Sequence, residues 1–168
     1  MKKNIIYILI TVVVFIGIIY FAKPNEDQNK KVDSSSIQVS SASSLTANTT
    51  RFNFGEISMK NGNVKHEFEV VNNTINPVLV SKVYTSCMCT RAFVTINGKT
   101  KGPFGMPGHG VVPKADMEIL SQEQAIITIE FDPKAHGPAG VGRIEREIYI
   151  EDEDGSQVIL SFEAIVTP

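Results

Sequence analysis

Several absences narrow the possibilities for this 168-residue chain before any motif is considered. Tryptophan is missing and there are only two cysteines, one residue apart, so the Trp and the widely spaced Cys pair of antibody-type domains are both lacking. Residues 51–168 carry 11 Lys and Arg against 15 Asp and Glu with no basic cluster, which argues against a nucleic-acid partner. Familiar hydrolase, metalloprotease and dinucleotide-binding motifs are also absent, so we predict no catalytic residue and a non-enzymatic protein.

One long apolar run is present near the amino terminus. Residues 5–22 hold no charge, and as a helix these 18 residues would span roughly 27 Å, close to the thickness of the bilayer hydrocarbon. We predict a single-pass membrane anchor over residues 1–23. A cleaved signal segment is the alternative, although Tyr20 stands where cleavage needs a small residue. Lys2 and Lys3 precede the run, which favours an amino terminus inside and the remainder of the chain outside.

The composition changes after the apolar run and again at residue 51. Residues 24–50 are rich in Ser, Thr and Asn, with too little apolar surface to offset the entropy of ordering the backbone. We therefore predict a disordered linker over 24–50. Residues 51–168 are long enough for one domain with its own core.

The hydrophobic pattern of residues 51–168 has a period of two. Apolar side chains alternate with polar ones in four segments: 64–70, 125–131, 144–150 and 157–166. Residues 78–84 add a run rich in β-branched side chains, and turn pairs such as Asn97-Gly98 separate the segments. No long helical period is present, and 114–124 offers one turn of helix at most. The pattern predicts an all-β, immunoglobulin-like antiparallel sandwich of about seven strands.

A family resemblance rests on motifs in a fixed order. Phe52-Asn53-Phe54-Gly55 opens the domain, the segment 86–90 contains the two cysteines, and Phe131-Asp132-Pro133 follows later. This order resembles the bacterial domain-of-unknown-function family 1573, an immunoglobulin-like fold related to major sperm protein and Hydin-type domains. The resemblance implies a prokaryotic cell and a domain outside its cytoplasmic membrane, and it supplies no biochemical activity. The chain departs from the family pattern at Met88, where glycine is usual, and in a longer segment over 97–113.

The two cysteines, Cys87 and Cys89, are candidates for chemistry because they lie so close in sequence. On an extended strand their Cα atoms would be about 6.6 Å apart with parallel side chains, so a disulfide between them needs local bending. Thiolate, thioether and imidazole ligands suit Cu(I). Cys87, Cys89, Met106 and His109 therefore make a candidate four-ligand copper site, with Met106 and His109 supplied by a Gly/Pro-rich loop.

Three functional hypotheses stay open at this point. The leading one is a membrane-tethered, extracytoplasmic binding or structural module that recognises an envelope protein, with Cys87 and Cys89 as a buried pair or a passive disulfide. The second is copper(I) binding or handling through the four ligands above, with no other cofactor predicted. The third is thiol-disulfide exchange through the two cysteines. His66 is interpreted as a core or edge histidine, His136 as a loop residue, and 151–155 as a solvated acidic turn.

Overall fold

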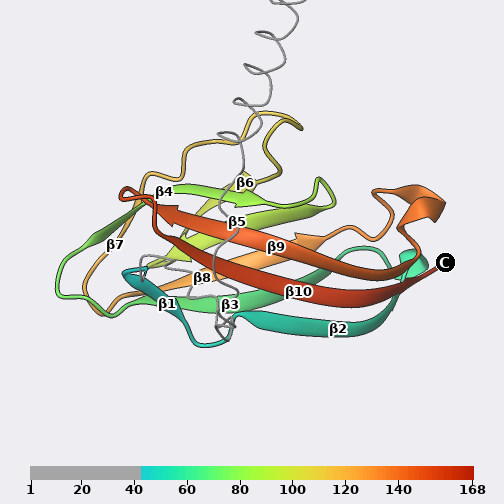
Figure 1. Cartoon of the computed structure of the whole chain (residues 1–168), viewed down its shortest axis with the longest axis horizontal. Coiled ribbons are helices and arrows are strands. Elements are labelled where there is room, and N and C mark those ends of the chain that lie inside the picture. The colour runs from blue at the N-terminus through green and yellow to red at the C-terminus, as the bar shows by residue number, and fades with distance from the viewer. Residues whose placement is uncertain (1–42) are drawn as a thin grey trace, which may run out of the picture. The chain divides into compact units, whose positions relative to one another are not determined.

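Alternation of apolar and polar side chains produces strands where the sequence predicts them. The computed structural model describes residues 43–168, and each of the five predicted segments forms a strand (Figure 1). In chain order the strands are β1 (Leu45–Ala47), β2 (Arg51–Ser58), β3 (Val64–Asn72), β4 (Val78–Thr85), β5 (Thr90–Ile96), β6 (Lys99–Phe104), β7 (Met117–Ile119), β8 (Gln124–Phe131), β9 (Gly142–Asp152) and β10 (Gln157–Thr167). Two short 3-10 turns, Met59–Asn61 and Gly137–Gly140, interrupt the loops.

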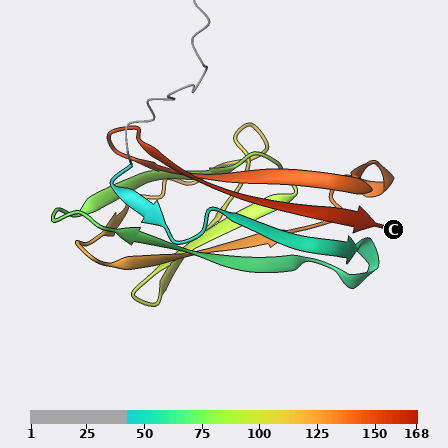
Figure 2. The ribbon, with the colours of Figure 1, turned by 60° about the horizontal axis from the view of Figure 1, so that its bottom comes forward.

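The strands form two five-stranded sheets that pack face to face as a sandwich. One sheet has the order β1-β3-β8-β5-β6 and the other β2-β10-β9-β4-β7. All pairings are antiparallel except that of β2 with β10, which run side by side in the same direction (Figure 2). The wholly antiparallel prediction is therefore wrong for this pair. The parallel pair arises because the chain crosses from one sheet to the other between β1 and β2.

The core is aliphatic and phenylalanine-rich, as expected of a sandwich without tryptophan or a disulfide between its sheets. Phe68, Phe104 and Phe162 are among its largest fully buried side chains. The ring of Phe162 in β10 lies 5.3 Å from that of Phe131 in β8, so this contact joins the two sheets. Burial of such rings is the main source of stability in a fold of this kind.

Two predicted segments and the predicted number of strands differ from the structure. Residues 45–47 lie in the predicted linker but form β1, because the side chain of Leu45 enters the core and is 2% exposed. The segment 114–124 contains strand β7 in place of a helical turn, and Met117 and Ile119 point inward from it. Residues 43–168 form ten strands where about seven are predicted, since β1 and β7 are only three residues long and β6 has Phe104 as its one buried residue, so none of the three shows a clear alternation.

The predicted membrane anchor (1–23) and most of the predicted linker (24–50) lie outside the described residues. Within 43–168, no helix is both long and apolar enough to cross a membrane.

Candidate functional site

The two cysteines sit in a tight turn between β4 and β5, and they are joined by a disulfide bond. The amide of Thr90 donates a hydrogen bond to the carbonyl of Cys87 (3.1 Å), which closes the turn and brings the two cysteine Cα atoms to 5.2 Å. The segment is thus bent, unlike the extended strand considered from the sequence, and bending is what makes the bond between neighbours possible. We call residues 86–90 the disulfide turn.

Backbone and hydroxyl groups hold the disulfide turn from three sides. The buried hydroxyl of Thr85 donates to the carbonyls of Cys87 (3.0 Å) and Thr90 (3.1 Å). Ser86 and Glu147 of β9 exchange two hydrogen bonds of 2.9 Å, and the amide of Asp132 donates to the carbonyl of Cys89 (2.9 Å). With its backbone groups paired in this way, the turn is held firmly against β9 and the loop after β8.

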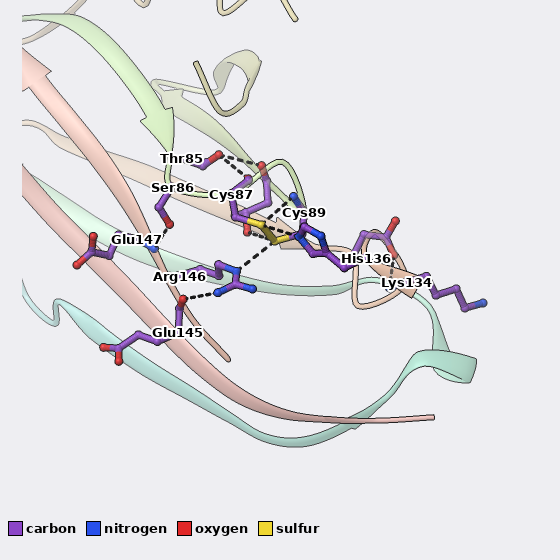
Figure 3. The surroundings of a disulfide bond; sticks show 11 residues. Thr85, Ser86, Cys87, Cys89, Lys134, His136, Glu145, Arg146 and Glu147 are labelled. Carbon is purple, nitrogen blue, oxygen red and sulfur yellow. Dashed lines mark hydrogen bonds between the residues drawn. A yellow bond between two sulfur atoms is a disulfide. The ribbon is translucent and has the colours of Figure 1, made fainter. Parts of the chain in front are cut away.

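Each sulfur has its own polar neighbour (Figure 3). The Nε2 atom of His136 lies 3.2 Å from the Sγ of Cys87. The Nε–H of Arg146 donates to the Sγ of Cys89 at 3.3 Å, and its Nη1 donates to the carbonyl of Glu145 at 2.7 Å. A disulfide flanked by an imidazole on one sulfur and a guanidinium on the other has two chemically different ends.

The carboxylates beside Arg146 are engaged elsewhere. Glu145 pairs with Arg51, and Glu147 accepts a hydrogen bond from the hydroxyl of Tyr149, which raises the pKa of Tyr149 to about 12. Within residues 43–168 the guanidinium of Arg146 makes no salt bridge. Partial burial lowers the pKa of Arg146 because desolvation disfavours its charge. The guanidinium of Arg146 therefore lies against the sulfur of Cys89, and no carboxylate among the described residues pairs with it.

A pocket of about 570 Å³ opens beside the disulfide turn. Its walls come from residues 86–88, from Met106 and His109, from His136, and from 145–147 of β9. The loop over 105–110 returns to the cysteines because the carbonyl of Gly105 accepts a hydrogen bond from the amide of Thr85 (3.2 Å). Cys87, Met106 and His109 of the predicted copper site thus share this pocket, which we call the disulfide pocket, whereas Cys89 does not line it.

Within residues 43–168, a close group of potential metal ligands shares Cys87 and Cys89 with the predicted set and contains His136 in place of Met106 and His109. The sulfurs of Cys87 and Cys89 and a ring nitrogen of His136 all lie within 4.8 Å of one another. His136 comes from the loop after β8, 49 residues from Cys87, and the sequence predicts a loop residue at this position. Two sulfurs and an imidazole suit Cu(I), but the sulfurs are available as ligands only after the disulfide is reduced.

Arg146 is a site residue that the sequence analysis did not single out, although a signal was present. In β9 the side chains of Ile144, Ile148 and Ile150 are buried on one face, and Arg146 occupies the same row. A charged residue between buried isoleucines of one strand row needs polar partners, and here they are the sulfur of Cys89 and the carbonyl of Glu145. The break in the apolar alternation at Arg146 marks the position, but only the fold identifies its partner.

The structure also describes His66 and the acidic turn over 151–155. His66 is half-buried between the sheets, where its ring stacks on Phe52 with a centroid distance of 3.5 Å and meets Phe68 edge to face. It is an edge-of-core histidine, as predicted. The acidic turn over 151–155 is not wholly solvated, because Asp152 is buried and its carboxylate accepts hydrogen bonds from the amides of Asp154 and Ser156.

Comparison with known proteins supports the family and the fold. The model of the family described as "Protein of unknown function (DUF1573)" matches residues 45–102, a range that contains the disulfide turn. The segment 45–102 is therefore similar to the DUF1573 family, as the motifs predict. No curated protein matches the sequence.

Among solved structures, a protein of unknown function from Porphyromonas gingivalis W83 is similar, with a TM-score of 0.53 and 16% identity. The similarity covers 72% of this chain and 46% of that protein, so the chain spans less than half of its length. At this identity the likeness supports the sandwich fold alone. The secreted serine protease VesC from Vibrio cholerae matches at a TM-score of 0.46 and 10% identity, over 74% of this chain and 24% of that one. The PapD-like domain 7 of human CEP192 matches at 0.40 and 11%, over 85% and 98%.

The fold explains why the motifs on which the resemblance to DUF1573 rests occur together in this chain. Thr90 pairs with Phe131 across β5 and β8, and Asp132 hydrogen-bonds to Cys89 through its amide. The Cys-x-Cys-Thr and Phe-Asp-Pro segments, about 40 residues apart in sequence, are therefore neighbours at one end of the sandwich. The loop that follows Phe131-Asp132-Pro133 carries His136 to the disulfide.

Proposed function

We propose that this chain is a membrane-tethered, extracytoplasmic binding module, and that the disulfide pocket is where it holds a polypeptide segment of an envelope partner. The observation that carries the proposal is the pocket itself, open to solvent and walled by Met88 and Met106. Met88 is 50% exposed beside a turn whose backbone is firmly held. Methionine side chains adapt to varied apolar surfaces, which suits a site for a protein side chain.

Binding through a sheet edge, the other route considered for such a module, is less well supported. Within 43–168 the edge strands β1 and β7 are three residues long. Edge strand β6 carries exposed Lys99 and Lys101 and a proline, which discourage the addition of another strand. Edge strand β2 has an irregular register at Gly55, whose amide is taken by the side chain of Asn53. We therefore place the binding surface at the loops.

Site-specific photo-crosslinking in membranes of the host tests this proposal. A photoreactive residue would replace Met88 in the full chain, and a matched control would carry it at Ile75, which is 89% exposed. Ile75 precedes β4 and the disulfide turn follows it, so the two positions lie at opposite ends of the same strand. We expect a discrete adduct from position 88, none from position 75, and loss of the adduct when Met106→Asp places a charge in the pocket. Equal labelling from both positions, or none from position 88, would refute the proposal.

The tether requires its own test. If residues 1–23 anchor the chain with the domain outside, protease added to intact spheroplasts removes the domain while the chain fractionates with membranes. A domain that stays protected until the membrane is permeabilised would contradict this orientation.

Copper(I) binding is a second candidate, favoured by the close group of Cys87, Cys89 and His136. The reduced full chain would be titrated with Cu(I) against a competing chelator. Loss of uptake in Cys87→Ser is expected for any donor set that includes this sulfur. His136→Ala and His109→Ala then separate the group seen in the structure from the set predicted with Met106 and His109. Uptake by Cys87→Ser equal to that of the unchanged chain would dismiss the copper site.

A further inference from the structure

The two sulfurs of the disulfide differ in how a reactant can approach them. Cys87 lines the disulfide pocket and is 8% exposed, whereas Cys89 is 3% exposed and is absent from the pocket wall. The carbonyl of Cys89 is tied to Asp132, and its sulfur faces Arg146 on the inner row of β9. A thiol entering from solvent through the pocket therefore meets Cys87 first.

The sulfurs also differ in what would stabilise a thiolate. Cys87 has the amide of Cys89 (3.2 Å) and the ring of His136 (3.2 Å) as neighbours. Cys89 has the Nε–H of Arg146 (3.3 Å), a permanent cation without a salt bridge among the described residues, and the hydroxyl of Thr90 (3.7 Å). A thiolate is best stabilised by a nearby cation in a partly desolvated site, so Cys89 is the better leaving group.

We propose that the Cys87–Cys89 disulfide exchanges with a thiol-bearing polypeptide in a fixed direction, in which the incoming thiolate attacks the Sγ of Cys87 and Cys89 departs beside Arg146. The inference rests on the proposed function only for its substrate, a cysteine-containing segment held in the disulfide pocket. Arg146 acts as a positioning residue that holds the charge of the departing sulfur.

The exchange has two steps, and together they transfer two electrons from the substrate to the Cys87–Cys89 pair. The substrate thiol loses its proton to water, and its thiolate forms a bond to the sulfur of Cys87 while the Cys87–Cys89 bond breaks and its electron pair goes to Cys89. A second thiol of the substrate, deprotonated in the same way, attacks the substrate sulfur of this mixed disulfide and releases Cys87 as a thiolate. Two protons from water then complete the two cysteine thiols. The substrate dithiol is oxidised to a disulfide, and the Cys87–Cys89 pair is reduced by two electrons.

Glutathione is the probe for the direction of attack. The oxidised full chain in mild detergent would be mixed with glutathione, quenched with acid at short times and alkylated, and the site of each modification would be read by fragmentation mass spectrometry. We expect glutathione on Cys87 and the alkyl group on Cys89. Glutathione mainly on Cys89, an even division between the two, or no mixed disulfide at all would overturn the proposal.

Variants of Arg146 test the leaving-group role. Arg146→Met should slow formation of the mixed disulfide by about tenfold, the scale of one charge-assisted hydrogen bond, and Arg146→Lys should recover part of the rate. Arg143→Met is the matched control, because Arg143 lies on the same strand but pairs with Glu163 at the surface. Recovery by lysine separates a charge effect from a packing defect. An unchanged rate in Arg146→Met would refute the role of the guanidinium.

The outcomes for this inference and for the proposed function are distinguishable. Glutathione is small and needs no docking surface, so directional exchange can occur even if photo-crosslinking at position 88 fails. Conversely, crosslinking at position 88 together with an inert disulfide would leave a binding module with a passive clip and would refute the exchange step alone.

Discussion

Asn72, at the end of β3, provides the sharpest test of how this sandwich is held together. Its side chain is fully buried and makes four hydrogen bonds. The Nδ2 atom donates to the carbonyls of Asn76 (2.8 Å) and Ile119 (2.9 Å), and the Oδ1 atom accepts from the amide and the hydroxyl of Thr74 (2.9 and 2.7 Å). One amide group thus shapes the loop before β4 and fastens the short strand β7, which belongs to the opposite sheet.

Replacing Asn72 by alanine should destabilise the domain by about 3 kcal/mol. Each hydrogen bond contributes about 1 kcal/mol net, and the buried carbonyl of Ile119 would lose its side-chain partner without access to water. Thr74 is partly exposed, so water can replace the hydrogen bonds that Thr74 loses to Asn72. The loss in free energy of unfolding is therefore smaller than the sum of four hydrogen bonds and a desolvation penalty.

The assay is urea unfolding of the full chain in mild detergent, followed by circular dichroism. Asn73→Ala is the matched control, because Asn73 is the exposed neighbour and its side chain bonds only to Thr46 (2.5 Å). The control should change the free energy of unfolding by roughly 0.5 kcal/mol or less. If Asn72→Ala and Asn73→Ala differed by less than about 1 kcal/mol with equal slopes, the role assigned to the buried amide would be wrong.

Three further changes are expected to have measurable effects. Burial lowers the pKa of His66, so the unfolded chain binds more protons than the folded one below about pH 6.5. The stability contributed by the neutral ring is therefore present above about pH 6.5 and lost as the pH falls. In parallel urea titrations at about pH 7.5 and about pH 5, the free energy of unfolding of His66→Phe should rise relative to that of the unchanged chain as the pH is lowered. Phe162→Ala, which empties a fully buried position between the sheets, should cost about 4 kcal/mol by the same measurement, whereas a Phe162→Leu variant that lost as much would contradict a cavity effect. Gly102→Ala should destabilise β6, because Gly102 has a φ of +131° and an added Cβ would lie 2.8 Å from the carbonyl of Ala92; unchanged protection of β6 amides in hydrogen exchange would show that the strand tolerates it.

The candidate site could be predicted only in part, and its residues show why. Cys87 and Cys89 are recognisable from their spacing, and Met106 and His109 from the composition of their loop, because these signals are local. His136 is a single residue in a glycine-rich segment, and nothing in its neighbourhood indicates that the β5–β8 pairing carries it to Cys87. Arg146 interrupts the alternation of apolar residues in β9, which indicates that its side chain has a polar partner. The interruption does not identify that partner, which is the sulfur of Cys89.

What the sequence by itself determined is the part of the molecule set by local chemistry. The period of two and the turn residue pairs were sufficient for an all-β sandwich, and the motifs were sufficient for the similarity to DUF1573 that is found over residues 45–102, since both depend on neighbouring residues. The tertiary structure decided the parallel pairing of β2 with β10 and the place of Leu45 in the core. It also decided that His136 and Arg146 lie beside the disulfide. These features depend on which strands become neighbours, and that choice is made by the packing of two whole sheets, which no single segment encodes.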